Sequence, residues 1–257
     1  MQRTIIDDLK NVEIITDEFI VKPDTKNIHL LNSKKVEHLN IYSFNQKQFE
    51  KAVEYFNVSS LSFYEFRVED LSPIENLDKI ESLSLTWNSK AVQLWNMEKN
   101  KQLRQLKVSD FSKLRSIELI KTGASLEILE LSGGVWTRIN IESLLPLSGL
   151  SRLKQLTLTN IKVDDQSLEP LLELKHLEVL ELSNQFPVEE YAKLSVVLTE
   201  TECNLFSAYT KLKSPIGDKD IMITGKGKPF LNSILDTKQI NAFKTKFQKI
   251  QEHISNS

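Results

Sequence analysis

Leu126-Glu-Ile-Leu129-Glu-Leu131 has a pattern of apolar residues that returns twice further along the chain, and this repetition is the strongest indication of the fold. The second copy is Leu153-Lys-Gln-Leu156-Thr-Leu158 and the third is Leu177-Glu-Val-Leu180-Glu-Leu182. Each copy reads L-x-x-L-x-L, and alternate side chains of an extended segment point to the same side. The pattern predicts three short strands that bury their leucines on one face.

Looser copies of the same pattern precede these three. The middle apolar residue of each copy serves as an anchor, and the anchors are Leu39, Leu61, Leu83, Leu106, Leu129, Leu156 and Leu180. Successive anchors are 22, 22, 23, 23, 27 and 24 residues apart, and steps of about 20 to 29 residues are typical of leucine-rich repeats. From Val36 to Val197 the chain resembles leucine-rich-repeat proteins, of an intracellular, bacterial-like type with irregular repeats.

The resemblance implies an α/β solenoid, with a curved parallel sheet on the concave side and short helices on the convex side. Each repeat of such an array buries its leucines only against its neighbours. Helix-like apolar spacing occurs between the strands at residues 46–56, 164–174 and 188–197. The 27-residue step contains Gly133-Gly134-Val135-Trp136, where we expect a small bulged loop.

One position departs from the family pattern. Three residues after the last strand leucine the family usually has Asn or Cys, whose side chain bonds the backbone of the turn. In this chain the position is filled by Phe44, Phe66, Asn88, Phe111, Gly134, Ile161 and Gln185. Only Asn88 fits, so the phenylalanines are expected to stack as an apolar spine. Asn160 and Asn184 lie one residue early, which predicts shifted turns.

We expect three regions along the chain, because the terminal repeats of a solenoid need caps. Residues 1–35 are predicted to form a strand-rich N-terminal cap, with apolar segments at 12–15, 19–21 and 28–31. Residues 36–200 hold about seven repeats, and residues 201–257 form a C-terminal cap. That cap is predicted to contain a degenerate strand at 203–206, glycine-rich turns, and an amphipathic helix over 236–250 with Asp236 as its N-cap.

The composition is that of an ordinary globular protein. Of 257 residues, 35 are acidic and 33 basic, and a formal charge of −2 gives no general attraction to nucleic acid or to an anionic membrane. Cys203 is the only cysteine, so no intrachain disulfide can form. Asp7 and Asp8 interrupt the segment where a signal peptide would be apolar. We therefore expect a cytoplasmic monomer without nucleic-acid or membrane partners.

The sequence offers little catalytic chemistry. In the segment Gly217–Pro229, the run Gly225-Lys-Gly227-Lys-Pro229 lacks the spacing of a phosphate-binding loop, and a strand–turn–strand element is expected instead. The four histidines are scattered without metal-ligand spacing, and Cys203 has no histidine beside it in sequence. We expect no metal, no cofactor and no enzyme activity.

The concave face remains as the candidate binding surface. Tyr42 and Tyr64 occupy the same slot of neighbouring repeats, and Trp87 lies close to that slot in the next. Aromatic residues are favoured as interface anchors. The candidate contact residues are Tyr42, Tyr64, Trp87, Asn40, Ser62, Ser84, Lys107 and Glu130. The alternative is that these aromatic residues pack against the N-terminal cap or merely cover the strand edge.

The repeat array therefore favours a non-catalytic module for protein–protein interaction, whose partner the residues do not identify. Two alternatives share the same sequence. One is an immunity-like protein that occupies and neutralises a toxin. The other is an enzyme that uses the Gly217–Pro229 loop.

Overall fold

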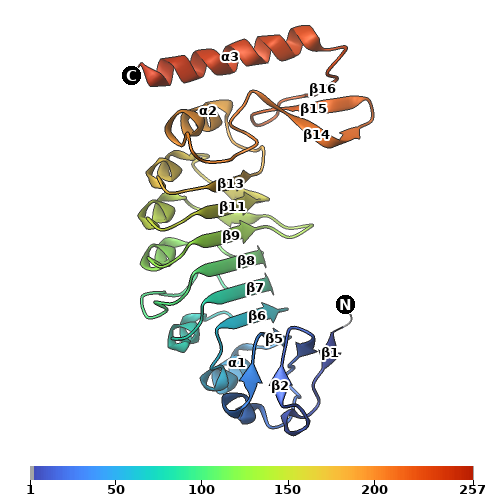
Figure 1. The fold of residues 1–257 in the computed structure, drawn as a ribbon, viewed down its shortest axis with the longest axis vertical. Helices are drawn as coiled ribbons and strands as arrows, with labels where there is room; N and C mark the ends of the chain where they lie inside the picture. The colour runs from blue at the N-terminus through green and yellow to red at the C-terminus, as the bar shows by residue number, and fades with distance from the viewer. Residues whose placement is uncertain (1–2, 257) are drawn as a thin grey trace.

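A seven-stranded parallel sheet runs through the computed structural model, which describes residues 3–256. The strands lie side by side in chain order, one from each repeat (Figure 1). They are β5 (Leu39–Tyr42), β6 (Ser60–Tyr64), β7 (Ser82–Asn88), β8 (Gln105–Phe111), β9 (Ile128–Ser132), β11 (Gln155–Thr159) and β13 (Val179–Leu182).

The register of this sheet confirms the repeat alignment. Each anchor leucine pairs with the anchor of the next repeat, from Leu39 opposite Leu61 to Leu156 opposite Leu180. A slip of one residue would turn every buried side chain toward solvent, and all seven anchors are buried. The architecture is an α/β leucine-rich-repeat solenoid.

Short helical segments return the chain from one strand to the next and stack along one side of the sheet (Figure 1). Most of them are short 3-10 helices of three to five residues. The segments are α1 (Gln46–Ala52), η3 (Val53–Tyr55), η4 (Ser72–Asn76), η5 (Glu118–Thr122), η6 (Leu145–Gly149), η7 (Glu169–Glu173) and α2 (Val188–Val197). A capping box of Asn45 and Gln48 fixes the start of α1.

The helix predicted over residues 164–174 is wrong except for its last turn, η7. Pro170 lies in this segment, and a proline inside an α-helix removes one backbone donor and clashes with the preceding turn. The chain instead forms β12 (Ile161–Val163), turns, and enters η7 with the proline in its first turn.

The 27-residue step contains the expected loop and an additional strand. β10 (Ile139–Ile141) follows the loop and pairs in parallel with β12, which adds a second short ladder beside the main sheet. The loop itself protrudes from the sheet edge between β9 and β11 (Figure 1). This repeat is three to five residues longer than the others and contains both β10 and the projecting loop.

The N-terminal region repeats the same motif in a reduced form. β1 (Thr4–Ile5) pairs in parallel with β3 (Phe19–Ile20), and β2 (Ile14–Ile15) pairs with β4 (Lys35–Val36). The strand predicted at 28–31 is wrong, because these residues lie in a 3-10 helix, η2 (Ile28–Ser33), which follows η1 (Leu9–Asn11). η2 packs against η3 of the helical stack and buries Leu31.

Phe44, Phe66 and Phe111, which follow the last apolar residue of the repeat pattern by three positions, are buried, but they do not form one column. Phe66 stacks on Phe63 at 4.1 Å between ring centroids and meets the edge of Phe49 at 5.1 Å. Asn88 occupies the equivalent position between Phe66 and Phe111. It donates to the carbonyl of Val68 at 2.7 Å and accepts two backbone N–H groups, as the family pattern implies.

A three-stranded antiparallel sheet and a long helix close the C-terminal end (Figure 1). The elements are β14 (Tyr209–Ile216), β15 (Lys219–Ile223), β16 (Phe230–Leu231) and α3 (Thr237–Ser255). Gly217 turns the first hairpin with a φ of 63°. The strand predicted at 203–206 is wrong, because this segment is a turn and the preceding Glu202 makes only one isolated bridge to Val179.

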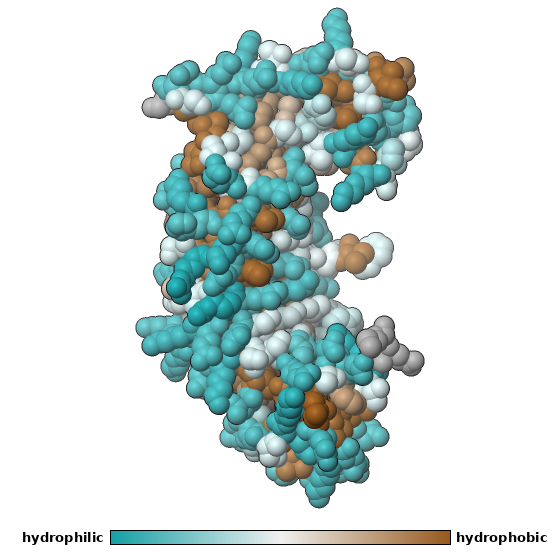
Figure 2. Space-filling view, viewed as in Figure 1, coloured by the Kyte–Doolittle hydropathy of each residue, from teal (hydrophilic) through white to brown (hydrophobic). Residues whose placement is uncertain are grey.

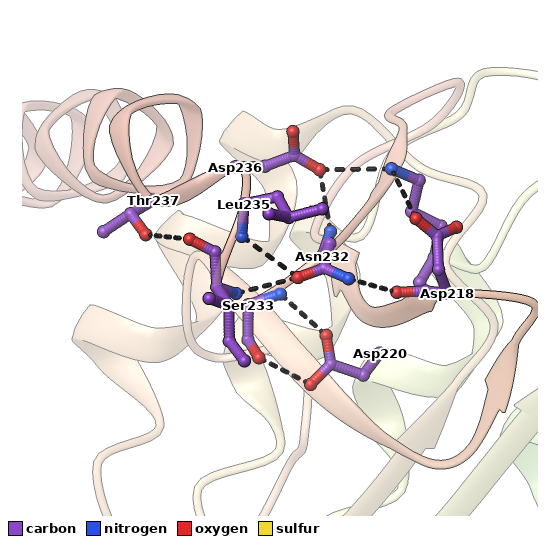
Figure 3. Close-up of polar contacts among 9 residues, drawn as sticks. Asp218, Asp220, Asn232, Ser233, Leu235, Asp236 and Thr237 are labelled. Carbon is purple, nitrogen blue, oxygen red and sulfur yellow. Dashed lines mark hydrogen bonds and ion pairs between the residues drawn. The ribbon is translucent and has the colours of Figure 1, made fainter.

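A hydrogen-bonded turn connects β16 to α3 (Figure 3). The side chain of Asn232 accepts from the amides of Ile234 and Leu235, and Asp220 binds Ser233. The helix begins beside Asp236 as predicted, but its carboxylate does not cap the helix. It accepts instead from the amide of Asn232 at 2.8 Å. The turn holds Ile234 and Leu235 in solvent, 82% and 77% exposed.

Candidate functional site

Three aromatic side chains lie in a row near the carboxyl ends of β5, β6 and β7. Tyr42 and Tyr64 are directly opposite each other, with ring centroids 5.0 Å apart, and Tyr64 meets Trp87 at 5.7 Å. Tyr64 and Trp87 are 41% and 47% exposed. Tyr42 is half-buried and accepts a hydrogen bond from Arg3 at 2.8 Å, so it also contacts the N-terminal region. We call Tyr42, Tyr64 and Trp87 the aromatic rim.

The backbone at this edge has a repeated left-handed conformation. The residue four positions after the anchor has a positive φ in five repeats: Ser43, Glu65, Trp87, Asp110 and Asn160. Asn and Asp tolerate this conformation, whereas it costs an ordinary L-residue roughly 1–2 kcal/mol. Trp87 is the bulkiest member of the row, and a tryptophan side chain does not favour the positive φ of this position. The exposed indole is therefore not explained by the fold.

The loop of residues 133–137, which we call the rim loop, leans against the edge of β8. A Cβ on Gly134 would lie 2.3 Å from Cγ of Asp110, and one on Gly133 would lie 2.3 Å from the carbonyl oxygen of Asn160. Only glycine allows this approach. The Asn160 side chain donates to the Gly134 carbonyl at 2.7 Å. So fixed, the loop projects Val135 and Trp136, and Figure 2 shows a hydrophobic group protruding at this place.

A pocket of about 410 Å³ lies between the aromatic rim and the rim loop. Its lining combines exposed aromatic rings with one carboxylate, one valine, and the hydroxyls of two threonines and one serine. The lining residues are Tyr64, Thr86, Trp87, Asp110, Ser112, Val135, Trp136 and Thr137. We call it the rim pocket. Recognition of a partner group there would use ring faces and a single negative charge.

The other candidate residues are buried, half-buried or already paired, so they are less available to a partner. Asn40 is fully buried, so its expected exposure on the sheet face is wrong: the N-terminal region covers β5, and the Asn40 amide donates to the carbonyls of Asp17 and Phe19. Lys107 and Glu130 form an ion pair at 2.9 Å and neutralise each other. Ser62 and Ser84 are half-buried on the sheet face between these groups.

His38 adds a titratable group beside Ser62. Its ring nitrogens lie 2.6 Å from the hydroxyl of Ser60 and 3.0 Å from that of Ser62. Burial lowers the pKa of His38 below its ordinary value of 6.5, so the folded protein favours the neutral ring. In the sequence this residue is one of four scattered histidines without metal-ligand spacing.

We expect a small loss of stability on mild acidification that depends on His38. The unfolded chain binds this proton at a higher pH than the folded chain, so the free energy of unfolding falls as the pH drops from about 6.5 through the lowered pKa. Thermal unfolding of the native chain and of His38→Gln, between about pH 7.5 and about pH 5, measures the effect. A His38→Gln variant with an equally steep pH dependence would contradict the prediction, since Glu65 and Asp220, whose pKa values are lowered by hydrogen bonds, lose their contribution only at more acidic pH.

The Gly217–Pro229 segment is a structural element, as the predicted strand–turn–strand is present in β15 and β16. Its lysines are engaged: Lys226 donates to Gln166 at 2.5 Å, and the ammonium of Lys228 lies 5.9 Å from the centroid of Phe243. Burial raises the pKa of Cys203 to about 11, which keeps the thiol protonated near neutral pH. Across residues 3–256, His, Cys, Asp and Glu form no group suited to a metal ion.

Of the eight residues that line the rim pocket, the candidate contact residues named from the sequence included only Tyr64 and Trp87. Val135 and Trp136 belong to a loop whose direction no apolar period specifies, and Asp110 lies just beyond the alternating part of its strand. The signal available was Gly133-Gly134 before a tryptophan, since paired glycines mark a close backbone approach.

Comparison with known proteins places two internalins of Listeria monocytogenes among similar solved structures. Internalin C2 is 22% identical over 58% of this chain, with a TM-score of 0.44, and the internalin inlF is 19% identical over 71%, with a TM-score of 0.48. The match covers 62% and 58% of those two chains, so each extends well beyond the shared part. The fold assignment rests on the strand register described above.

No protein-family model and no curated protein matches the sequence. Within residues 3–256, no helix is both long enough and apolar enough to cross a bilayer.

Proposed function

We propose that this protein is a non-catalytic interaction module of the cytoplasm, which binds a protein partner as a monomer through the aromatic rim and the rim loop. The observation that carries the proposal is the exposure of Tyr64, Trp87 and Trp136 around one pocket. Interfaces are enriched in Tyr and Trp, and such residues provide much of the binding energy where they are desolvated.

Two features indicate that these side chains serve a partner rather than the fold. Trp87 keeps a large side chain at a backbone position that favours Asn or Asp. Trp136 is 95% exposed on a loop that two glycines and Asn160 hold in place. The Trp136 ring is almost wholly in solvent, so only contact with another molecule would bury it, and about half of Trp87 remains exposed beside Tyr64.

We expect Tyr64→Ala combined with Trp87→Asn to weaken partner binding by a factor of about 100 or more. Each aromatic anchor contributes about 2 kcal/mol or more at an interface, and every 1.4 kcal/mol is a factor of ten in affinity. The partner would first be captured from cytoplasmic extract with the immobilised full chain and purified. Its dissociation constants for the native chain and the variant would then be measured by calorimetry.

Thr157→Ala with Thr159→Ala is the matched control on the same sheet, and it should change the affinity by less than about three-fold, since hydroxyls at an interface rim contribute little. Circular dichroism should show an intact fold, because Trp87→Asn replaces a strained residue by one that tolerates a positive φ. Normal binding by the aromatic variant would contradict the proposal. Loss of binding only in the threonine variant would move the interface to the C-terminal half of the sheet.

A further inference from the structure

We propose that the rim pocket receives a lysine or arginine side chain of the partner, whose cationic group lies between the aromatic rings and pairs with Asp110. The inference rests on the proposed function, because it names the chemistry that the binding surface selects. It follows from the residues that line the pocket, from the lack of an ion pair at Asp110 within residues 3–256, and from the distribution of charge along the chain.

The walls of the pocket suit a cation. Tyr64, Trp87 and Trp136 all line it and all are exposed. The face of an aromatic ring carries a negative quadrupole, and a cation within about 6 Å of a ring centroid is attracted to it, most strongly for Trp. A flat guanidinium can also stack on an indole. Several rings around one pocket are the arrangement that recognises ammonium groups.

Asp110 supplies a negative charge that the chain itself leaves unbalanced. Its carboxylate accepts a hydrogen bond from the hydroxyl of Thr137, and no lysine or arginine of residues 3–256 forms an ion pair with it. Two basic residues close to Asp110 in sequence have other partners. Lys107 pairs with Glu130, and Arg115 pairs with Asp164.

The basic side chains near the rim loop do not enter the pocket. Arg138 and Lys162 line a separate pocket on the C-terminal side of the loop. Asp110 is half-buried and lines the pocket, so a cation in the pocket would lie close to its carboxylate, whereas a carboxylate from outside would meet ring faces and a like charge. The local charge favours a basic group as the occupant.

The charge of the whole molecule supports the same sign. Residues 1–208, which carry the pocket, contain 24 basic and 31 acidic residues, a formal charge of −7. Residues 209–257 contain 9 basic and 4 acidic residues, a formal charge of +5, so the two parts together give the −2 of the chain. A field of one sign around a site raises the rate of encounter with partners of the opposite sign.

The test uses small probes, so it does not depend on the partner. N-acetyl-Gly-Arg-Gly amide would be titrated into the full chain, followed by the same peptide with citrulline, which has the shape of arginine without its charge. The readout is tryptophan fluorescence, since Trp87 and Trp136 line the pocket whereas Trp95 is buried. We expect millimolar binding of the arginine peptide and at least about ten-fold weaker binding of the citrulline peptide, as for hydrogen bonds to charged groups.

Two variants make the same charge change at different places. Asp110→Asn keeps the side-chain shape and tolerates the positive φ, and it should weaken arginine-peptide binding by about ten-fold. Asp78→Asn, at an exposed turn outside the pocket, should leave binding unchanged. Equal affinity for the two peptides, or an unaffected Asp110→Asn, would overturn the inference. Binding of a glucose oligosaccharide in place of the arginine peptide would overturn it too, since the rings would then be a sugar-stacking surface.

Failure of this inference is distinguishable from failure of the proposed function. If the Tyr64→Ala, Trp87→Asn variant loses the partner while the native chain ignores the arginine peptide, the surface stands and the assigned chemistry is wrong. If the arginine peptide binds as expected while that variant retains its partner, the pocket is cationic in preference but the partner does not use it.

Discussion

Deletion of residues 236–257 is expected to lower the melting temperature by roughly 10 °C or more, or to make the protein aggregate. The first half of α3 covers the three-stranded sheet through Ile240, and its second half buries Phe247 against the end of the solenoid. Losing the helix also uncovers Ile221, Ile223 and Leu231. Full burial of one such side chain contributes about 1.5–3 kcal/mol, and each kcal/mol shifts the midpoint of a chain this size by about 2–4 °C.

Adjacent point variants control for the deletion. Phe247→Ala should reproduce a large part of the loss, about 3–5 kcal/mol for a buried phenylalanine, whereas the neighbouring Lys246→Ala removes an exposed side chain and should be nearly silent. Thermal unfolding followed by circular dichroism, with light scattering for aggregation, gives the comparison. An unchanged cooperative transition in the deleted chain would mean that the helix does not cap the array.

Leu129→Ala should destabilise the protein by about 2–5 kcal/mol, the usual cost of emptying a buried leucine site. Leu129 is buried in β9 and lies between Leu106 of β8 and Leu156 of β11 in the sheet. The cavity therefore opens at the contact between three repeats. A denaturant titration with a common slope for both proteins measures the change in the free energy of unfolding.

Glu130→Ala, one residue along the same strand, serves as the matched control. Glu130 is half-buried on the other face, where it pairs with Lys107 and accepts from Ser132. An ion pair at a surface contributes about 0–1 kcal/mol, so this variant should lose less than 1 kcal/mol. Equal losses at both positions would show that the two faces are not divided between core and solvent as the register requires.

The sequence was sufficient for the sheet because its information there is redundant. Each anchor leucine is fixed by its own strand pattern and by the distance to the anchors before and after it, and all six predicted pairings are present. The same redundancy does not exist between the strands. Ile28–Leu31 is a short apolar run that suits a strand or a helical turn equally well, and only its packing against η3 selects the helix.

The candidate site was predictable in its rings and not in its surroundings. Alternation along β5 and β6 places Tyr42 and Tyr64 side by side, and the structure has their rings in contact. Asn40 follows the same alternation, yet it is buried, because the covering segment comes from residues that the repeat pattern does not describe. The position of Trp136 could not be predicted from the sequence, because tertiary contacts set the direction of a loop, here the contact of Gly134 with Asp110.

The row of residues with left-handed backbone at the strand ends marks positions of the surface that can be substituted without disturbing the core. Ser43, Glu65, Trp87, Asp110 and Asn160 differ in size, charge and polarity, yet they share one backbone geometry. Substitution at this row leaves the leucine core untouched, and the backbone cost is the roughly 1–2 kcal/mol that separates residue types in this conformation. Asp110 and Asn160 also hold the rim loop through hydrogen bonds. Ser43, Glu65 and Trp87 are therefore the positions along this edge where new specificities can be selected or engineered one residue at a time with the core unaltered.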